Sequence, residues 1–426
     1  MAIYNHVVMP IHARRRSVRS ISLMKNKLEA YKCYANEALH FKLVRHESDL
    51  EDDRTTFHPD MTHQLFGDQE SIFGYKDLEI QLYYSAAKLT TYLHIKYFDK
   101  VSPKRFEGVS ADDVIKILAK EMPPGYYTNL DDFVAALPKD ANFKPYGDLL
   151  HSYTVHKDGR DRKFEIYKTS IDCPGFRDYH ERLQTFLLFF VDAASFIDVD
   201  DDRWSFYLVF EKYRDNGNRI YAIVGYMTVY NYYAYPEKVR PRVSQVLIMP
   251  PFQRQGHGAQ LLQTFYNECY RRKDILDITV EDPSENFQRL RDFVDAKNCS
   301  NLASFQPRHL HNGFSEEMMK EAQEKLKLSR KQARRVYEIL RLRVTDPSNI
   351  KQYRKYRLDI KKRLNIPFQK NGRDFQKLQR ALRPDELNAT LSCMSIEQRH
   401  CYLEKAFEEH VEMCRHVVER LAESAD

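Results

Sequence analysis

Residues 243–271 constrain the fold of this chain more than any other segment. Residues 243–249 are mostly apolar and β-branched, which is typical of a strand, and two prolines end that strand. Gly256 and Gly258 follow closely, and apolar side chains then recur at helical spacing through residues 259–271. This order of strand, glycine loop and helix predicts a fold that contains both a β-sheet and helices.

The glycine loop, residues 253–259, is suited to a pyrophosphate ligand. The first turn of a helix has N–H groups without intrahelical partners and carries the positive end of the helix dipole. Glycines let the backbone approach a phosphate with no Cβ in the way. A Walker loop would need a Lys after the glycines and a dinucleotide-binding loop a third glycine, and the sequence has neither. We interpret His257, between the glycines, as a spacer that points outward rather than as a catalytic base.

A candidate general base follows the next predicted strand. Residues 276–280 alternate apolar and polar side chains, and Glu281 comes directly after them. Open sheets place their sites at the carboxyl ends of strands. A carboxylate at such a position can accept a proton from a substrate group, so Glu281 is a candidate general base. Asp282, followed by Pro283 and Glu285, has the pattern of a helix N-cap with its capping-box partner.

Composition narrows the class of protein. The 426 residues exceed what one core usually holds, so two or three domains are expected. The seven cysteines form no C-x-x-C pair, which favours reduced thiols in an intracellular protein. The net charge of +6 is too balanced to indicate nucleic-acid binding by the whole chain, and no apolar run reaches the length of a membrane span.

Changes in pattern along the chain predict its organisation. Strands are expected at residues 164–168, 206–212 and 220–230, with a hairpin turn at 215–218, and a helix at 179–195. Helix N-cap signals precede Val114 and Phe133. The expected segments are a flexible basic arm at 1–27, an N-terminal α+β domain at 28–142, a central core with the glycine loop at 143–275, the C-terminal part of the catalytic region at 276–346 and a helical tail at 347–426.

Two basic segments leave alternatives open. The arm at residues 1–27 has several arginines and no acid, which we interpret as a disordered basic arm. The alternatives are a mitochondrial transit peptide and a weak nuclear-import patch. Residues 320–385 have a basic excess, which we interpret as a solvated helical face. The alternative is a docking surface for an acidic partner or nucleic acid.

The sequence also resembles a known family. Residues 253–259 (QRQGHGA) resemble the Q-x-x-G-x-G-A motif of the GNAT superfamily of N-acetyltransferases. The runs 196–201, 224–233, 240–245 and 333–341 resemble those of type B histone acetyltransferase catalytic subunits, and the likeness extends from about residue 28 to the C-terminus. It implies an α+β fold with a central GNAT-type mixed β-sheet, an N-terminal α+β domain and a helical C-terminal region.

The resemblance implies an activity and its partners. The expected enzyme transfers acetyl from acetyl-CoA, without a metal, to lysine in the tail of newly synthesised, free histone 4. The expected partner is a WD-repeat histone-binding chaperone subunit, in nucleus and cytoplasm, with no membrane and no direct nucleic-acid contact required. The alternatives are an acetyltransferase for another protein or small amine, and a non-catalytic histone chaperone subunit that binds acetyl-CoA.

Site residues follow from the resemblance by position. Glu281 corresponds to the general base, and Asp282 and Asp192 to supporting acids. The implied cofactor contacts are Val246, Leu247, Ile248, Gln253, Arg254, Gln255, Gly256, His257, Gly258 and Ala259. The implied substrate contacts are Asp68, Gln69, Glu70, Trp204, Tyr230, Asn231 and Tyr232. Residue type alone favours a core or strand-packing role for the three aromatic residues, and the resemblance reverses that preference for Trp204. Asp192 departs from the Glu common in the family, and Gln69 stands where an acid is common.

Overall fold

The structure is a computed structural model that describes residues 27–106, 108–215, 217–368, 380–383 and 395–424. The predicted arm, except Lys27, lies outside the described residues. The chain divides into two compact units. The first comprises Met1–Thr228 and Val246–His257, and the second Val229–Gln245 and Gly258–Asp426. The boundary therefore passes through the strand pair that leads to the glycine loop.

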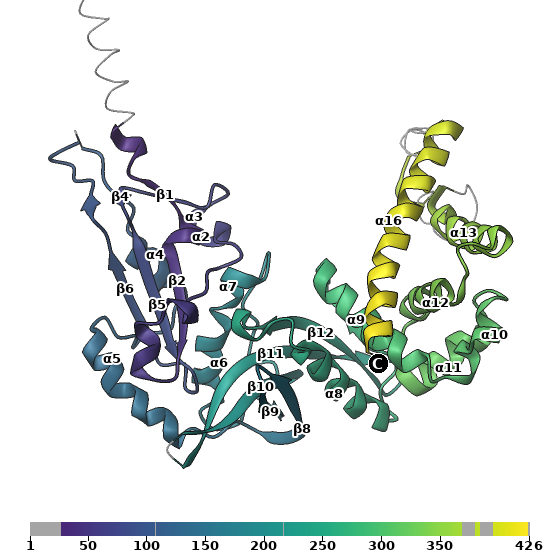
Figure 1. Cartoon of the computed structure of the whole chain (residues 1–426), viewed down its shortest axis with the longest axis horizontal. Coiled ribbons are helices and arrows are strands. Elements are labelled where there is room, and N and C mark those ends of the chain that lie inside the picture. Colours follow the sequence, from purple (N-terminus) through teal and green to yellow (C-terminus); the bar gives the residue numbers. More distant parts are fainter. Residues whose placement is uncertain (1–26, 107, 216, 369–379, 384–394, 425–426) are drawn as a thin grey trace, which may run out of the picture. The chain divides into compact units, whose positions relative to one another are not determined.

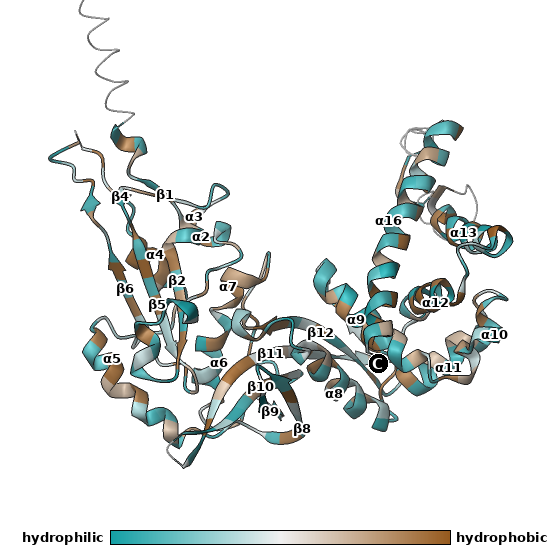
Figure 2. Cartoon of the chain, in the orientation of Figure 1, coloured by the Kyte–Doolittle hydropathy of each residue, from teal (hydrophilic) through white to brown (hydrophobic). Residues whose placement is uncertain are grey.

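The N-terminal part of the first unit is built on a three-stranded sheet (Figure 1). Its order is β2-β5-β6, with β2 parallel to β5 and β5 antiparallel to β6. The strands are β2 (Leu39–Val44), β5 (Glu79–Ser85) and β6 (Thr91–Lys96). Figure 2 shows hydrophobic stretches alternating with hydrophilic ones along β5 and β6, and most side chains of β5 are buried. The smaller strands are β1 (Lys32–Tyr34), β3 (Ser71–Phe73), β4 (Tyr75–Lys76) and β7 (Asp99–Lys100).

Short helices accompany this sheet. They are α2 (Ala35–Ala38), α3 (His63–Phe66), α4 (Val114–Glu121) and α5 (Leu130–Ala136). Asp113 caps α4 by accepting from the Lys116 N–H, as the signal before Val114 predicts. The N-cap predicted directly before Phe133 is wrong in position. Asn129 caps α5, and Asp131 and Asp132, which precede Phe133, lie in the first turn of the helix.

A mixed six-stranded sheet forms the centre of the chain. Its order is β13-β12-β11-β10-β9-β8; β8, β9 and β10 pair antiparallel, and β12 and β13 pair parallel. The strands are β8 (Asp148–Lys157), β9 (Arg160–Thr169), β10 (Trp204–Asp215), β11 (Asn218–Ala234), β12 (Lys238–Ile248) and β13 (Thr279–Val280). The strands predicted at 164–168, 206–212 and 220–230 are confirmed, and the turn between β10 and β11 lies where the hairpin was predicted. The strand predicted at 276–280 is shorter, because only its last two residues join the ladder.

The helix predicted at residues 179–195 is wrong in its extent. Two short helices occupy the segment, α6 (Phe176–Gln184) and α7 (Leu187–Phe190). The backbone carbonyl of Phe189 accepts the N–H groups of Asp60 and Met61, at 3.0 and 3.2 Å, and is therefore engaged outside the helix. This long-range pairing, invisible to helical periodicity, ends the helix early.

Helices dominate the second unit (Figure 1). After α8 (His257–Arg271), which starts at the unit boundary, the longer helices are α9 (Glu285–Cys299), α11 (Glu316–Leu326), α12 (Arg330–Val344), α13 (Ile350–Leu364) and α16 (Ile396–Glu423). A short helix, α10 (Pro307–Leu310), precedes α11. The helix α16 contacts α9, α12 and α13. Its apolar residues Phe407 and Val411 pack with Tyr356 and Ile360 of α13. The predicted helical C-terminal region is thus confirmed for the described residues.

No helix among the described residues is both long enough and apolar enough to cross a membrane.

Candidate functional site

The edge of β12 changes its pairing partway along the strand. The strand β13 pairs with β12 only at Arg242 and Val243, and the Glu281 N–H then donates to the Val243 carbonyl at 2.9 Å. Pairing with β13 therefore stops before Val246. The three residues from Val246 to Ile248 continue the strand beyond that point. Such an edge can pair with amide groups of an extended ligand, as it would with an added strand.

The glycine loop that follows has its backbone in conformations suited to an anion. Arg254 and Gly256 have φ angles of +60° and +88°, both in the left-handed region. A Cβ built at Gly256 would meet no heavy atom within 4 Å, so the space beside this glycine is open. The sequence of the loop contains no acidic side chain. The loop then enters α8, whose first turn supplies N–H groups and the positive dipole end. These features fit a pyrophosphate.

The two glutamines of the loop stabilise its shape. The Gln253 side-chain amide donates to the Ile248 carbonyl at 2.9 Å, and the Gln255 side-chain amide donates to the Pro251 carbonyl at 3.0 Å. Each side chain thus bonds back to the segment that precedes the loop, leaving the loop's own N–H groups out of these bonds. Arg254 is exposed, so its guanidinium can reach a bound phosphate or solvent.

The prediction that His257 points outward is wrong. Its side chain is 1% exposed, and its ring centroid lies 4.3 Å from that of Phe164. Nδ1 lies 2.8 Å from the Tyr153 hydroxyl, while Nε2 is buried without a hydrogen-bond partner among the described residues. Burial, assisted by the charge of Arg162, lowers the pKa of His257 to about 4, so the ring is neutral at neutral pH. His257 anchors the loop onto β8 and β9.

Glu281 belongs to a polar and aromatic cluster in the second unit. The Ser244 hydroxyl donates to Glu281 Oε2 at 2.7 Å, and Arg242 Nη1 lies 3.6 Å from Oε1. The Glu281 side chain is 45% exposed, so it remains accessible to water or substrate. The Arg242 guanidinium also lies over the Tyr232 ring at 5.1 Å, and the Tyr232 and Tyr230 rings are 4.6 Å apart. Glu281 and the two tyrosines, which were predicted for different roles, therefore join one cluster.

Sequence reasoning missed Ser244 and Arg242 as parts of this cluster. Both lie on the half-exposed face of β12, two residues apart, because side chains alternate between the faces of a strand. This alternation was available in the sequence. The contact of these two residues with Glu281 was not available in the sequence, because it depends on the parallel pairing of β12 with β13. Asn231, from the same predicted set as the tyrosines, is half-buried on β11.

Asp282 does not cap the following helix, contrary to the prediction. Ser284 is the N-cap of α9, and its hydroxyl accepts from the Phe287 N–H at 3.2 Å. Asp282 has a φ angle of +27°, whereas an N-cap residue is normally extended. The residue is exposed beside Glu281, and its carboxylate has no capping role.

In the first unit, one histidine links two of the predicted acidic residues. His63 Nε2 lies 3.2 Å from Asp192 Oδ1, and His63 Nδ1 lies 3.8 Å from Glu70 Oε1. The Asp192 side chain is 76% exposed. Asp68 and Gln69 are exposed in the preceding turn. The structure therefore brings Asp192 close to the loop that contains residues 68–70, and His63 is a member that the sequence did not indicate.

Glu70 differs from its exposed neighbours, because its carboxylate is already fully engaged. Oε1 accepts from the backbone N–H groups of Thr62 and His63, and Oε2 accepts from the Tyr34 hydroxyl and the Asn36 amide. These bonds, that from Thr62 foremost, hold the pKa of Glu70 below its usual value. They also fill the acceptor sites of a carboxylate. Glu70 thus orders this loop.

Two further observations concern the predicted site. Trp204 is the first residue of β10 and is half-buried, so it does not belong to the fully buried core. No group of three or more His, Cys, Asp or Glu side chains that could hold a metal ion occurs among the described residues.

Two family models match the chain. The model described as "Histone acetyl transferase HAT1 N-terminus" matches residues 31–192. The model described as "Histone acetyltransferase type B catalytic subunit, C-terminal" matches residues 291–342. The matched ranges include Asp68, Glu70 and Asp192.

Relatives match over most of the chain. The histone acetyltransferase type B catalytic subunit of Homo sapiens is 52% identical over 404 residues, covering 94% of this chain and 96% of the relative. A protein of the same description from Dictyostelium discoideum is 34% identical, covering 75% of this chain and 70% of the relative. A crystal structure of an aminoglycoside acetyltransferase from a soil metagenomic sample is 17% identical over 30% of this chain and 83% of that chain, with a TM-score of 0.22. From the family models and the relatives, the chain belongs to the family of histone acetyltransferase type B catalytic subunits, and it is an acyltransferase that uses acetyl-CoA.

Proposed function

We propose that the chain transfers acetyl from acetyl-CoA directly to a lysine in the tail of newly synthesised, free histone 4, with Glu281 as the general base. The observation that carries the mechanism is the position of Glu281. It is a half-exposed carboxylate held by Ser244 at 2.7 Å, directly after β13 leaves the edge of β12. The histone 4 tail rests on the family resemblance.

The chemistry requires two proton transfers and one acyl transfer. A lysine ammonium, with a pKa of ~10.4, must first be deprotonated. Glu281 accepts this proton, directly or through a water molecule. The lysine nitrogen then bonds to the acyl carbon as the carbon–sulfur bond breaks, and the CoA sulfur leaves as a thiolate that takes up the second proton lost by the nitrogen. Ser244 fixes the orientation of Oε2, so that Oε1 is directed by the looser contact with Arg242. This contact is partly exposed and screened, so it leaves the carboxylate available to the substrate.

The residues proposed for acetyl-CoA form two groups. The backbone of Val246, Leu247 and Ile248 pairs with the amides of the pantetheine arm, where β13 no longer covers the strand. The loop Gln253, Arg254, Gln255, Gly256, His257, Gly258 and Ala259 holds the pyrophosphate through its N–H groups. When bound, acetyl-CoA supplies an acyl group already activated as a thioester, so no acyl-enzyme is needed. His257 contributes by anchoring the loop, since its ring is buried.

The proposed tail contacts combine acidic and aromatic side chains. In the second unit, Tyr230 and Tyr232 offer aromatic faces in the cluster that contains Glu281, Asn231 offers an amide on β11, and Asp282 is a supporting acid. Aromatic faces attract cations and pack against aliphatic stems. In the first unit, Asp68, Gln69, Trp204 and the supporting Asp192 offer charge and an aromatic surface to a basic peptide. We assign Glu70 to positioning this loop, because its carboxylate is saturated by internal hydrogen bonds.

The family resemblance also supports a partner and a location. We propose that the chain works with a WD-repeat histone-binding chaperone subunit, in the nucleus and the cytoplasm. Co-purification of the full chain with such a subunit, in the presence and absence of histone 4, would test this part.

Replacement of Glu281 by Gln tests the mechanism. Glu281→Gln keeps the size of the side chain but cannot accept the proton, so we expect kcat to fall by ~10² or more while acetyl-CoA binding is retained. Glu285→Gln is the matched control, because Glu285 is an 80% exposed carboxylate on α9 that pairs only with Arg289. Near-normal turnover of Glu281→Gln would rule out Glu281 as the base.

A further inference from the structure

A basic cavity of about 990 Å³ lies in the helical second unit. We call it the basic cavity and define it by its cationic lining: Arg330, Lys331, Arg334, Arg335, Lys362 and Arg363. Of the described residues that line it, two are acidic, Glu338 and Asp359. The cavity lies far along the chain from Glu281 and the glycine loop, and the proposed acetyl transfer uses none of its residues.

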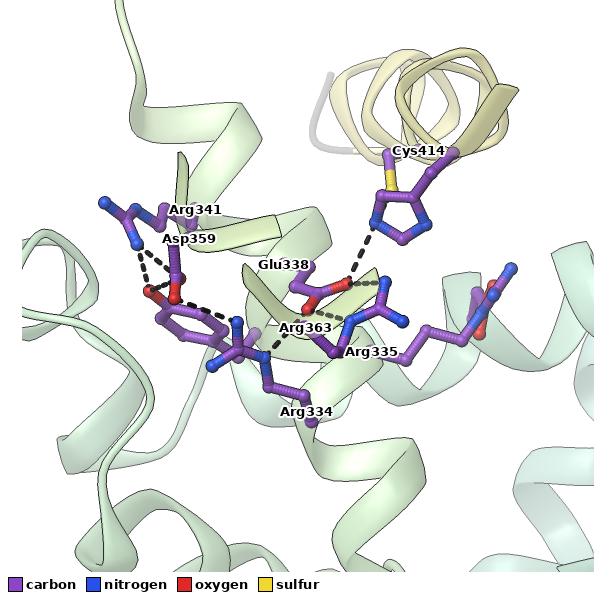
Figure 3. Close-up of polar contacts among 10 residues, drawn as sticks. Arg334, Arg335, Glu338, Arg341, Asp359, Arg363 and Cys414 are labelled. Atoms are coloured by element: carbon purple, nitrogen blue, oxygen red, sulfur yellow. Dashed lines mark hydrogen bonds and ion pairs between the residues drawn. The ribbon is translucent and has the colours of Figure 1, made fainter. Parts of the chain in front are cut away.

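The two acids are occupied by internal partners (Figure 3). Glu338 accepts from Arg334 Nε at 2.8 Å and from Arg363 Nε and Nη2 at 2.6 and 2.8 Å, and His410 Nε2 lies 2.9 Å from it. Asp359 pairs with Arg334 at 3.0 Å and with Arg341 at 2.6 Å. Glu338 is fully buried and these partners hold its pKa at about 2, despite burial. The network therefore neutralises both acids.

Cationic charge remains after this pairing. Lys331 and Lys362 are exposed and make no hydrogen bond or ion pair with the described residues. Arg335 bonds to Asp292 through Nε only, at 2.6 Å. Arg330 contacts Glu316, but both side chains are more than 60% exposed, so this pair is weak. The rim of the cavity thus presents two lysines, Lys331 and Lys362, that have no acidic partner in the described part of the chain.

The start of α12 adds an independent sign of a missing anion. Arg330 and Lys331 lie in its first turn, which contains no acidic residue. Cations at this end oppose the positive end of the helix dipole, and helices usually place acids there. Ser329 caps the helix through the Gln332 N–H, so the N-terminus is properly formed despite the unfavourable charges. An anionic group beside Lys331 would offset both the side-chain charges and the dipole.

The lining favours a peptide over a nucleic acid. The half-buried Phe314 ring already packs against Arg334 and Tyr337, at 5.6 and 5.5 Å, so it is a poor platform for base stacking. Ile366 is 49% exposed on the lining and offers an apolar contact. We propose that the basic cavity binds an acidic peptide segment of a partner protein, in which Asp or Glu side chains pair with Lys331 and Lys362 and an apolar side chain packs on Ile366.

Binding of a labelled peptide to the full chain tests this proposal. The probe is a fluorescein-labelled peptide in which Asp and Glu alternate with Leu, measured by fluorescence anisotropy. The double variant Lys331→Glu/Lys362→Glu should weaken binding by about tenfold or more, because two attractive contacts become repulsive. The two lysines have no hydrogen-bond or ion-pair partner within the described ranges, so the variant should fold, which its unchanged acetyl transfer would verify.

The matched control is Lys320→Glu/Lys355→Glu, which reverses two exposed lysines of α11 and α13 outside the cavity lining. We expect it to bind the peptide as the unaltered chain does. Equal weakening by both double variants would show only a general charge effect and overturn the proposal. Absence of peptide binding by the unaltered chain, or stronger binding of a single-stranded DNA probe with the same dependence on Lys331 and Lys362, would also overturn it.

Discussion

The buried ring of His257 makes the first unit sensitive to mild acid. Burial holds its pKa at about 4 in the folded chain, against ~6.5 in an unfolded chain. Because the folded value is the lower one, the unfolded state binds the proton more readily, and stability falls as pH falls through the window between these two values. Integration over this window gives a loss of ~2 kcal/mol from this one group between about pH 7 and about pH 5.

The structure explains why protonation has this cost. His257 Nδ1 already contacts the Tyr153 hydroxyl, and Nε2 has no hydrogen-bond partner among the described residues. Phe164 and Phe252 pack around the ring, with centroids 4.3 and 6.2 Å away, so a second N–H would be charged and buried among aromatic groups. Arg162 adds a repulsive charge.

Urea unfolding followed by Trp204 fluorescence measures the effect. Trp204 is the single tryptophan of the chain and belongs to the first unit, as His257 does. The quantity is the difference in unfolding free energy between the two pH values, compared between the unaltered chain and His257→Leu. We expect this difference to shrink by ~2 kcal/mol in the variant, because Leu fills a similar volume and does not titrate.

The matched control is His156→Leu, since the His156 side chain is 71% exposed. It should leave the pH dependence nearly unchanged. If His257→Leu retains the full pH dependence of the unaltered chain, the assignment of His257 as a buried neutral anchor of the loop is refuted.

Three further predictions concern the strand, the base and the C-terminal helices. A Cβ at Gly225 would lie 2.3 Å from the Leu247 carbonyl oxygen, so Gly225→Ala should destabilise the first unit by ~1–3 kcal/mol and weaken acetyl-CoA binding measured by calorimetry. Gly256 has open space beside it, so Gly256→Ala should destabilise the unit by only ~1 kcal/mol, which is the cost of a left-handed φ. Ser244→Ala removes the hydrogen bond that orients Glu281, so we expect kcat to fall by about tenfold with little change in KM. An unchanged kcat would show that Glu281 does not need the hydrogen bond from Ser244. Glu338→Gln leaves Arg334, Arg363 and His410 without their shared carboxylate, so the free energy of unfolding of the helical region should fall by ~3 kcal/mol and α16 should become more sensitive to protease. Unchanged resistance of α16 to protease would contradict the role of this network.

The local sequence pattern predicted those helices, strands and turns that depend mainly on interactions between neighbouring residues. The strand, loop and helix around Gly256 formed as predicted, because alternation, two prolines and helical spacing all favour the same result. The hairpin between β10 and β11 was likewise predictable from its turn residues. The division of the chain into five segments stays a prediction.

Tertiary contacts account for what the sequence did not reveal. The ring of His257 is buried because β8 and β9 provide Tyr153 and Phe164, which are about a hundred residues away. The helix predicted at 179–195 ends early because Asp60 and Met61 bond to the Phe189 carbonyl. Asp282 has the composition of an N-cap, but its backbone follows the exit of β13 instead. In each case a distant partner outweighs a local preference.

Acetyl transfer to separated core histones tests the central claim most directly. The unaltered chain and Glu281→Gln would each be incubated with radiolabelled acetyl-CoA and with free histones 2A, 2B, 3 and 4, a histone 4 tail peptide and free lysine. The account predicts that the unaltered chain labels histone 4 and its tail peptide far more than the other acceptors. It also predicts that Glu281→Gln binds acetyl-CoA but transfers ~10²-fold less label. Labelling of free lysine as fast as the tail peptide, or undiminished transfer by Glu281→Gln, would contradict it.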